Sequence, residues 1–164
     1  MKRLVIYWPM AAVILSAALA FPLAAQQPVP FKGAFHAKDC VVPENTGCST
    51  VNSFTVNTSG RGTGTHLGEF SLTEQTDLST LEGTGHWVAA NGDSIDTKFT
   101  SFADFTTQSL GYVTITETHT ITGGTGRFAA AQGNFILERT HLVEPSADGT
   151  HVTFGSFRGS ITMH

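Results

Sequence analysis

Residues 112–122 show the clearest alternation of side-chain types in the chain. One face of this segment carries Val113, Ile115, Glu117, His119 and Ile121, and every position between them is a threonine. A period of two residues is typical of a β-strand with one buried face. The pattern therefore predicts a strand that turns Glu117 and His119 toward the same interior as its aliphatic side chains.

Other segments have a weaker alternation or an apolar content typical of strands, and no long helical period is present. The predicted strands are 31–37, 51–58, 63–74, 81–90, 94–107, 134–143 and 151–163, in addition to 112–122. Their connections look short, which favours antiparallel neighbours. Eight such strands predict an all-β fold, either an eight-stranded antiparallel β-barrel or a two-sheet sandwich.

Glycines recur in Gly-Thr-Gly units at 62–64, 83–85 and 124–126. Repeated glycines let strands coil sharply at barrel corners, so the units favour the barrel over the sandwich. The stretch 59–62 is predicted to be a turn. The stretch 122–133 is predicted to be a corner with at most one short helical turn, formed by 129–132, and with Phe128 driven inward as a plug.

The N-terminus has the layout of a secretory signal peptide. A basic start precedes an apolar run over residues 4–23, and small residues follow. Cleavage after Ala25 predicts a signal peptide over 1–25 and a single domain over 26–164 in a secreted or periplasmic protein. Cleavage after residues 18–20 and a retained membrane anchor are the alternatives.

The charge balance limits the partners. The chain has 9 basic and 13 acidic residues, and cleavage would remove two of the basic ones, Lys2 and Arg3. An acidic domain is a poor partner for nucleic acid and for anionic membrane surfaces, so we expect neither after signal cleavage. Cys40 and Cys48 are the only cysteines, and an oxidising compartment predicts a disulfide between them.

The segment Gly-Gly-Thr-Gly-Arg-Phe-Ala-Ala-Ala-Gln-Gly-Asn-Phe over 123–135 resembles the Gly-Gly-Thr-Gly-x-Phe-x-x-Ala-x-Gly signature of the allene oxide cyclase and dirigent-like barrels. Segments 65–70, 90–93 and 155–161 are similar to small secreted bacterial proteins of that barrel type. The resemblance covers 31–163 and implies an eight-stranded barrel with a central cavity that holds an apolar substrate. No segment matches the active sites of the plant enzymes, so no catalytic residue is carried over.

The inward faces of the predicted strands carry polar side chains as well as apolar ones. The alternation places His66 inward beside Phe70, and Arg139 inward beside Phe135. We expect Arg139 and Glu117 to neutralise each other, because an unpaired buried charge is costly. These residues form either an internal network that fixes strand register or the polar end of a ligand pocket.

The leading hypothesis is a secreted barrel that binds an apolar or amphipathic small molecule in its interior. The expected ligand contacts are Phe70, Glu117, His119, Phe128 and Arg139. The first alternative is a cyclase or isomerase that needs no cofactor, with Glu117, His119 and His66 as candidate catalytic residues. The second is a structural module with a packed interior that assembles as a homo-oligomer. No complete metal-ligand set, hydrolase elbow or phosphate loop is present, so neither a metal nor a cofactor is expected.

Overall fold

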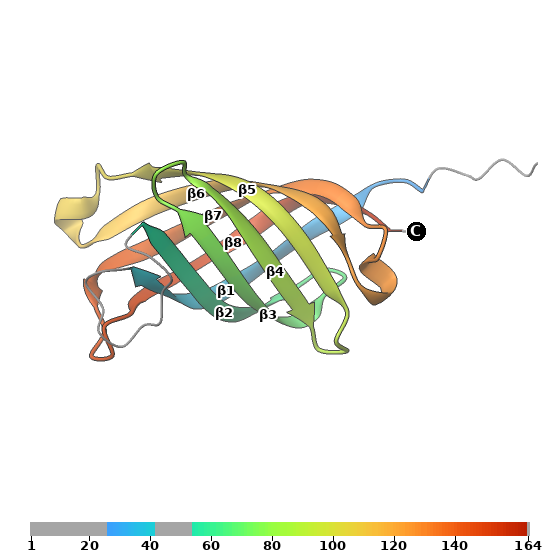
Figure 1. Cartoon of the computed structure of the whole chain (residues 1–164), viewed down its shortest axis with the longest axis horizontal. Helices are drawn as coiled ribbons and strands as arrows, with labels where there is room; N and C mark the ends of the chain where they lie inside the picture. Colours follow the sequence, from blue (N-terminus) through green and yellow to red (C-terminus); the bar gives the residue numbers. More distant parts are fainter. Residues whose placement is uncertain (1–25, 42–53, 164) are drawn as a thin grey trace, which may run out of the picture.

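The structure is a computed structural model that describes residues 26–41 and 54–163. These residues form one closed antiparallel barrel, in which each strand pairs with its neighbours in sequence and β1 pairs with β8 (Figure 1). The strands are β1 (Val29–Val41), β2 (Thr55–Gly64), β3 (Gly68–Asp77), β4 (Glu82–Ala89), β5 (Ser94–Asp104), β6 (Tyr112–Gly124), β7 (Gln132–Pro145) and β8 (His151–Thr162). The predicted eight-stranded antiparallel barrel is confirmed. The predicted signal peptide over 1–25 and Cys48 lie outside the described residues.

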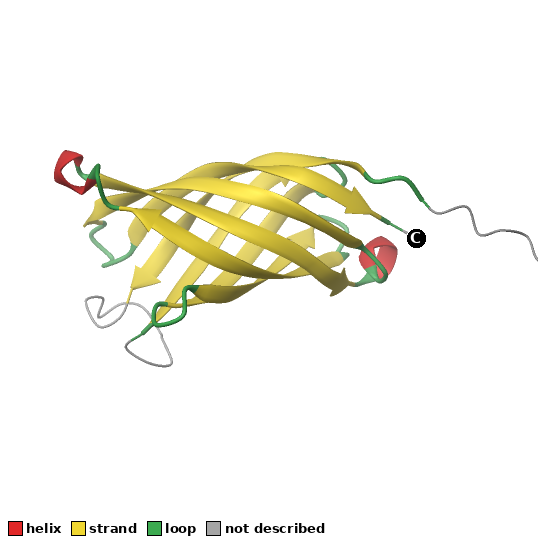
Figure 2. Ribbon diagram, turned by 90° about the horizontal axis from the view of Figure 1, so that it is seen from above, coloured by secondary structure: helices red, strands yellow, loops and turns green. Residues whose placement is uncertain are grey.

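Two short 3-10 turns are the helical elements of the described chain (Figure 2). They are η1 (Gln108–Leu110) and η2 (Gly126–Phe128). The expectation of at most one helical turn is therefore wrong, because η1 was not predicted. This turn ends at Gly111, which has the left-handed conformation with φ of 89°. The turn expected at 129–132 lies three residues earlier. Neither turn is long enough to cross a membrane, and no helix of the described residues is.

The two ends of the barrel differ in the connections that they carry. The β3–β4, β5–β6 and β7–β8 connections lie at one end, which we call the mouth end. The β2–β3, β4–β5 and β6–β7 connections lie at the other, which we call the closed end; η1 and η2 mark the two ends in Figures 1 and 2.

Aromatic side chains fill the closed half of the barrel. The Trp87 ring lies 5.1 Å from the ring of Phe70 and 5.1 Å from that of Phe157, and Phe31 lies 4.9 Å from Phe157. Phe128 of η2 is fully buried in this core, which confirms the predicted plug. Burial of large rings in contact with one another supplies most of the apolar area that this half removes from water.

Inward-facing glycines make room for these rings. A Cβ on Gly62 would lie 2.7 Å from Cζ of Phe70, and one on Gly83 would overlap the ring of Phe99. The first two Gly-Thr-Gly units are therefore not corners, because they lie within β2 and β4 and face the barrel interior. Residues 59–62, predicted to be a turn, are likewise part of β2. Only the third unit lies at a bend.

Candidate functional site

A cavity of about 390 Å³ opens at the mouth end of the barrel. This volume lies within the range of small-molecule sites. Its walls are mainly aliphatic, with contributions from Val41, Val56, Leu78, Leu81, Ala103, Val113, Ile115 and Val143. Its polar lining residues, which we call the floor, are Asp39, Thr76, Ser101, Gln108, Arg139, His141 and His151. The cavity therefore combines an apolar body with a polar base.

Arg139 forms ion pairs with two buried carboxylates, those of Asp39 and Glu117. Its Nη1 donates to both carboxylate oxygens of Asp39, at 2.8 and 2.9 Å. Its Nε donates to Oε1 of Glu117 at 3.1 Å, and Nη2 lies 2.9 Å from the same oxygen. All three side chains are buried. The predicted neutralisation of Arg139 by Glu117 is confirmed, and Asp39 joins it as a second partner.

The charges of this cluster are mutually supported. Burial alone would raise the pKa of Asp39, but the Arg139 guanidinium and hydrogen bonds from His141 and Thr58 hold that pKa below its ordinary value. Burial likewise opposes ionisation of Glu117, but Arg139 and His119 lower its pKa. The two carboxylates in turn overcome burial and raise the pKa of Arg139. The cluster of Asp39, Glu117 and Arg139, at and below the floor, therefore contains two carboxylates that favour the ionised form and one guanidinium.

His119 lies one step deeper than Glu117 along β6. Its Nε2 is 3.1 Å from Oε2 of Glu117, and its ring is stacked between Phe99 and Phe135, with centroid distances of 4.5 and 4.4 Å. Burial lowers the pKa of His119, against the opposing effect of Glu117. The imidazole is therefore neutral near pH 7. It forms hydrogen bonds with Glu117 and Thr97 while its ring packs in the core.

Glu74 of β3 completes the buried polar layer, and the sequence analysis missed it. Its Oε1 lies 4.0 Å from Nε2 of His119, and neither carboxyl oxygen has a hydrogen-bond partner among the described residues. Burial, reinforced by the negative charge of Glu117, raises the pKa of Glu74 well above its ordinary value. Glu74 therefore keeps its proton to higher pH than Glu117 does.

Within the part of the chain that the structure describes, Glu74, Glu117 and His119 form a group that could hold a metal ion. Each offers one ligand atom, and these atoms lie within 4.8 Å of one another. Two carboxylates and an imidazole suit several divalent cations. However, the Arg139 guanidinium already forms an ion pair with Glu117, and its positive charge would repel a cation bound at that carboxylate.

Two histidines at the floor were also missed. Nδ1 of His141 lies 2.6 Å from Oδ2 of Asp39. The ring of His141 is stacked on that of His151 at a centroid distance of 5.0 Å, and Nδ1 of His151 lies 3.0 Å from the carbonyl oxygen of Leu142. His141 follows Arg139 by two residues on β7, so the alternation of that strand was sufficient to place it inward.

The predicted site residues fall in different parts of the barrel. The structure brings Glu117, His119 and Arg139 together, but of these three only Arg139 lines the cavity, and Glu117 and His119 lie fully buried beneath it. Phe70 and Phe128 lie in the aromatic core and do not line the cavity, so their role as ligand contacts stays a prediction. His66 does not face the interior as predicted, because it lies in the β2–β3 turn, with φ of 65° and Nε2 3.2 Å from the carbonyl oxygen of Pro30.

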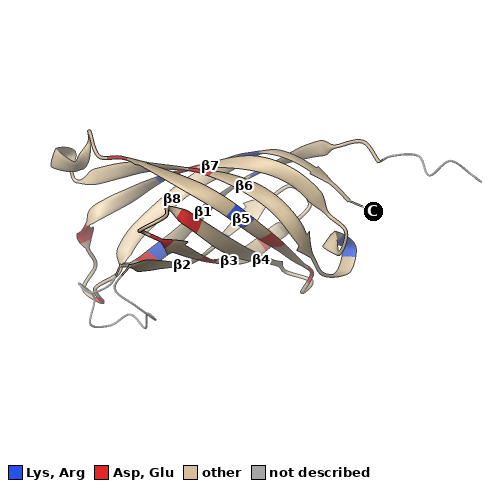
Figure 3. Cartoon of the chain, turned by 45° about the horizontal axis from the view of Figure 1, so that its top comes forward, with Lys and Arg blue, Asp and Glu red and all other residues tan. Residues whose placement is uncertain are grey.

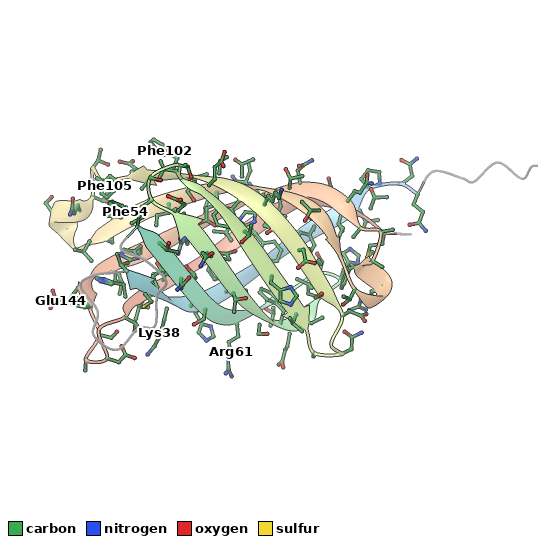
Figure 4. The ribbon with its side chains drawn as sticks, in the orientation of Figure 1. Lys38, Phe54, Arg61, Phe102, Phe105 and Glu144 are labelled. Carbon is green, nitrogen blue, oxygen red and sulfur yellow. The ribbon has the colours of Figure 1, made fainter. Side chains whose placement is uncertain are left out.

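Exposed apolar side chains surround the mouth. Phe54, Phe102 and Phe105 lie at this end (Figure 4) and are each more than half exposed. Leu78, Leu81 and Leu110, on two of the connections of the mouth end, are also exposed. Charged residues are sparse along the whole ribbon (Figure 3). Exposed apolar side chains therefore lie beside the entrance to the cavity, together with charged residues such as Asp77, Asp104 and Asp148 on the same strand ends and connections.

In comparisons with known proteins, the chain matches no family model, no curated protein and no solved structure. The resemblance of residues 123–135 to the allene oxide cyclase and dirigent-like barrels therefore stays a prediction from the sequence. The evidence on function comes from the cavity and its floor.

Proposed function

We propose that the protein is a secreted or periplasmic barrel that binds an apolar or amphipathic small molecule in the mouth cavity. The observation that carries this proposal is the cavity of about 390 Å³, with aliphatic walls above a polar floor. Sites of this kind gain affinity from buried apolar area and orientation from a few polar groups. The cavity therefore favours the ligand-binding role over the alternative of a structural module with a fully packed interior.

Two hydroxyl groups at the floor support the proposal. Oγ1 of Thr76 and Oγ of Ser101 are buried and have no hydrogen-bond partner among the described residues. Both residues line the cavity. Buried polar groups in native proteins are nearly always satisfied, by protein, water or ligand. The polar end of a ligand in the cavity would satisfy them after rotation of the two hydroxyl groups toward the cavity, because neither oxygen is exposed to it in the structure.

The cellular location is part of the same proposal. The basic and apolar layout of residues 1–25 and the pair Cys40 and Cys48 are both typical of an exported protein. Cys40 lies buried near the end of β1. Mass spectrometry of the exported protein tests both points, because cleavage after Ala25 and a disulfide each change the mass of the intact chain by a known amount.

The binding test uses fatty-acid and phenolic probes with the purified protein, measured by calorimetry. The cavity-filling variant Ile115→Trp is expected to abolish binding, since Ile115 lines the cavity. Thr116→Trp on the outer face of the same strand is the control and is expected to bind as the wild type does. Failure of the wild type to bind any probe would refute the proposal.

A cyclase or isomerase without a cofactor is the second candidate. The observation that favours it is the buried pair Glu74 and Glu117, because burial and Glu117 raise the pKa of Glu74 whereas Arg139 lowers the pKa of Glu117, and such opposed shifts separate the roles of acid and base. Neither carboxyl group lines the cavity, so this role requires a substrate that reaches past Arg139. The test is chromatography of a bound epoxide or olefin probe after incubation. Recovery of the probe unchanged by the wild type would contradict an enzymatic role.

A further inference from the structure

One acceptor at the cavity floor is not used by any described residue. A carboxylate can only accept, so the 2.6 Å contact between Nδ1 of His141 and Oδ2 of Asp39 places a proton on Nδ1. In the neutral ring, Nε2 then carries a lone pair. His141 lines the cavity, and no hydrogen bond from the described residues reaches its Nε2.

The ring of His141 is held in place from several sides. Asp39 of β1 fixes one edge, and the stacked ring of His151 from β8 covers one face. Asp39 itself is held by Thr58, whose hydroxyl donates to Oδ1 at 2.6 Å, and by Arg139. A group fixed in this way accepts a hydrogen bond without a large loss of side-chain entropy.

The charges of the floor discriminate between ligand head groups. The hydrogen bonds of Arg139 go to Asp39 and Glu117, so its positive charge is matched by two negative ones. A ligand carboxylate would meet these carboxylates without a free cation to receive it, and burial of an unpaired charge is costly. A neutral hydroxyl group avoids this cost and supplies the proton that Nε2 of His141 can accept.

We propose that the ligand ends in a hydroxyl group that donates a hydrogen bond to Nε2 of His141, with Asp39 as the residue that positions the ring. The apolar remainder of the ligand lies against the aliphatic walls of the cavity. This inference rests on the proposed ligand-binding function. It narrows the ligand class to neutral, hydroxyl-terminated apolar molecules.

The test compares three probes of equal chain length, which are a primary alcohol, its methyl ether and the matching fatty acid. The alcohol is expected to bind about fivefold to tenfold more tightly than the ether, the amount that one hydrogen bond contributes. The fatty acid is expected to bind more weakly than the alcohol at neutral pH. Equal binding of alcohol and ether, or tightest binding of the acid, would overturn this inference while leaving the binding function intact. If none of the probes binds, the binding function itself fails.

The variant His141→Asn tests whether the preference for alcohol over ether comes from Nε2 of His141. Its amide N–H can still donate to Asp39, but the acceptor at Nε2 is lost. The preference for alcohol over ether is expected to fall to about one, with the affinity for the ether unchanged. A preference that survives in His141→Asn would overturn the assignment.

His86→Asn is the matched control. Nδ1 of His86 lies 2.7 Å from Oδ1 of Asp96, but both side chains are about half exposed, so this histidine–aspartate pair lies outside the cavity. This variant is expected to retain the full preference. Should His141→Asn fold poorly, ¹⁵N NMR of the wild type decides, because the Nε2 resonance of His141 must move with the alcohol and stay in place with the ether.

Discussion

Replacement of Glu74 by glutamine is expected to stabilise the barrel by an amount that grows as the pH rises. Glu74 is buried, its carboxyl oxygens have no hydrogen-bond partner in the described structure, and Glu117 beside it is ionised. Burial and this negative charge raise the pKa of Glu74 well above 4.5. Glutamine has nearly the same shape and no charge to lose, so the variant keeps the packing and removes the ionisation.

The magnitude follows from proton binding in the two states. Above pH 4.5 the unfolded chain releases the proton of Glu74, whereas the folded barrel retains it. The folded state then binds more protons, so the free energy of unfolding of the wild type falls by about 1.4 kcal/mol for each pH unit. This loss begins at the unfolded pKa and ends where Glu74 ionises in the fold. Glu74→Gln lacks this loss, so its advantage grows with the same slope.

The assay is urea unfolding of the wild type and Glu74→Gln at several pH values from about 5 to 8. Titrations of other groups are common to both proteins and cancel in the difference. Glu69→Gln, on the exposed face of the same strand, controls for the loss of a carboxylate from β3. If Glu74→Gln were less stable than the wild type by the same amount at every pH, Glu74 would be ionised and paired in the fold, and the reasoning from burial would be wrong.

Three further substitutions test the packing and charge arguments. Arg139→Met is expected to lower the free energy of unfolding by about 3–5 kcal/mol, because it leaves buried carboxylates unpaired. Arg158→Met, which removes an exposed ion pair, is expected to lower it by less than about 1 kcal/mol. Equal losses of the two variants in urea unfolding would contradict this argument. Gly83→Ala is expected to cost about 1–3 kcal/mol, because its Cβ would overlap the Phe99 ring and lie 2.6 Å from the carbonyl oxygen of Gln75. Phe99→Leu in the same chain is expected to recover only the part due to the ring, and no recovery would assign the cost to the backbone contact. Gly126→Val is expected to abolish folding, since φ is 56° and a β-branched side chain is strained there; a native circular dichroism spectrum would show that this corner is not required.

The inward residues of the central strands were predictable because alternation is a local property. Once Val113 and Ile121 are assigned to the interior, Glu117 and His119 must share their face. The partner of Glu117 followed from the cost of an unpaired buried charge, and Arg139 pairs with it in the structure.

Residues near the ends of strands were missed because the predicted strands were too short or were not read to their last residue. The first strand was predicted to end at Ala37, yet β1 continues to Val41 and carries Asp39 inward. The third was predicted to end at Glu74, which stands two residues after Leu72 on the buried face of β3. Strand ends depend on pairing across the barrel, and a single sequence does not contain that information directly.

The place of the cavity was not predictable, because it depends on contacts between strands far apart in sequence. Rings of Phe70 and Phe157 fill the space left by inward glycines of β2 in the closed half. Toward the mouth, aliphatic and small polar side chains line the interior together with Phe105, Arg139, His141 and His151, and a cavity of about 390 Å³ is left between them. The glycines of β2 therefore mark where the closed half is packed with rings, whereas Gly83, near the start of β4 at the mouth end, makes room for the ring of Phe99.

The buried ion cluster is the strongest argument that the mouth is more than a packing defect. Burial of Asp39, Glu117 and Arg139 costs desolvation energy, and apolar side chains of similar volume commonly give equal or greater stability. Strand register does not require the cluster, because a one-residue slip would already turn every apolar side chain of a strand out of the core. A role in positioning His141 at the cavity floor accounts for the cost, because the cluster fixes Asp39 and Asp39 fixes the ring.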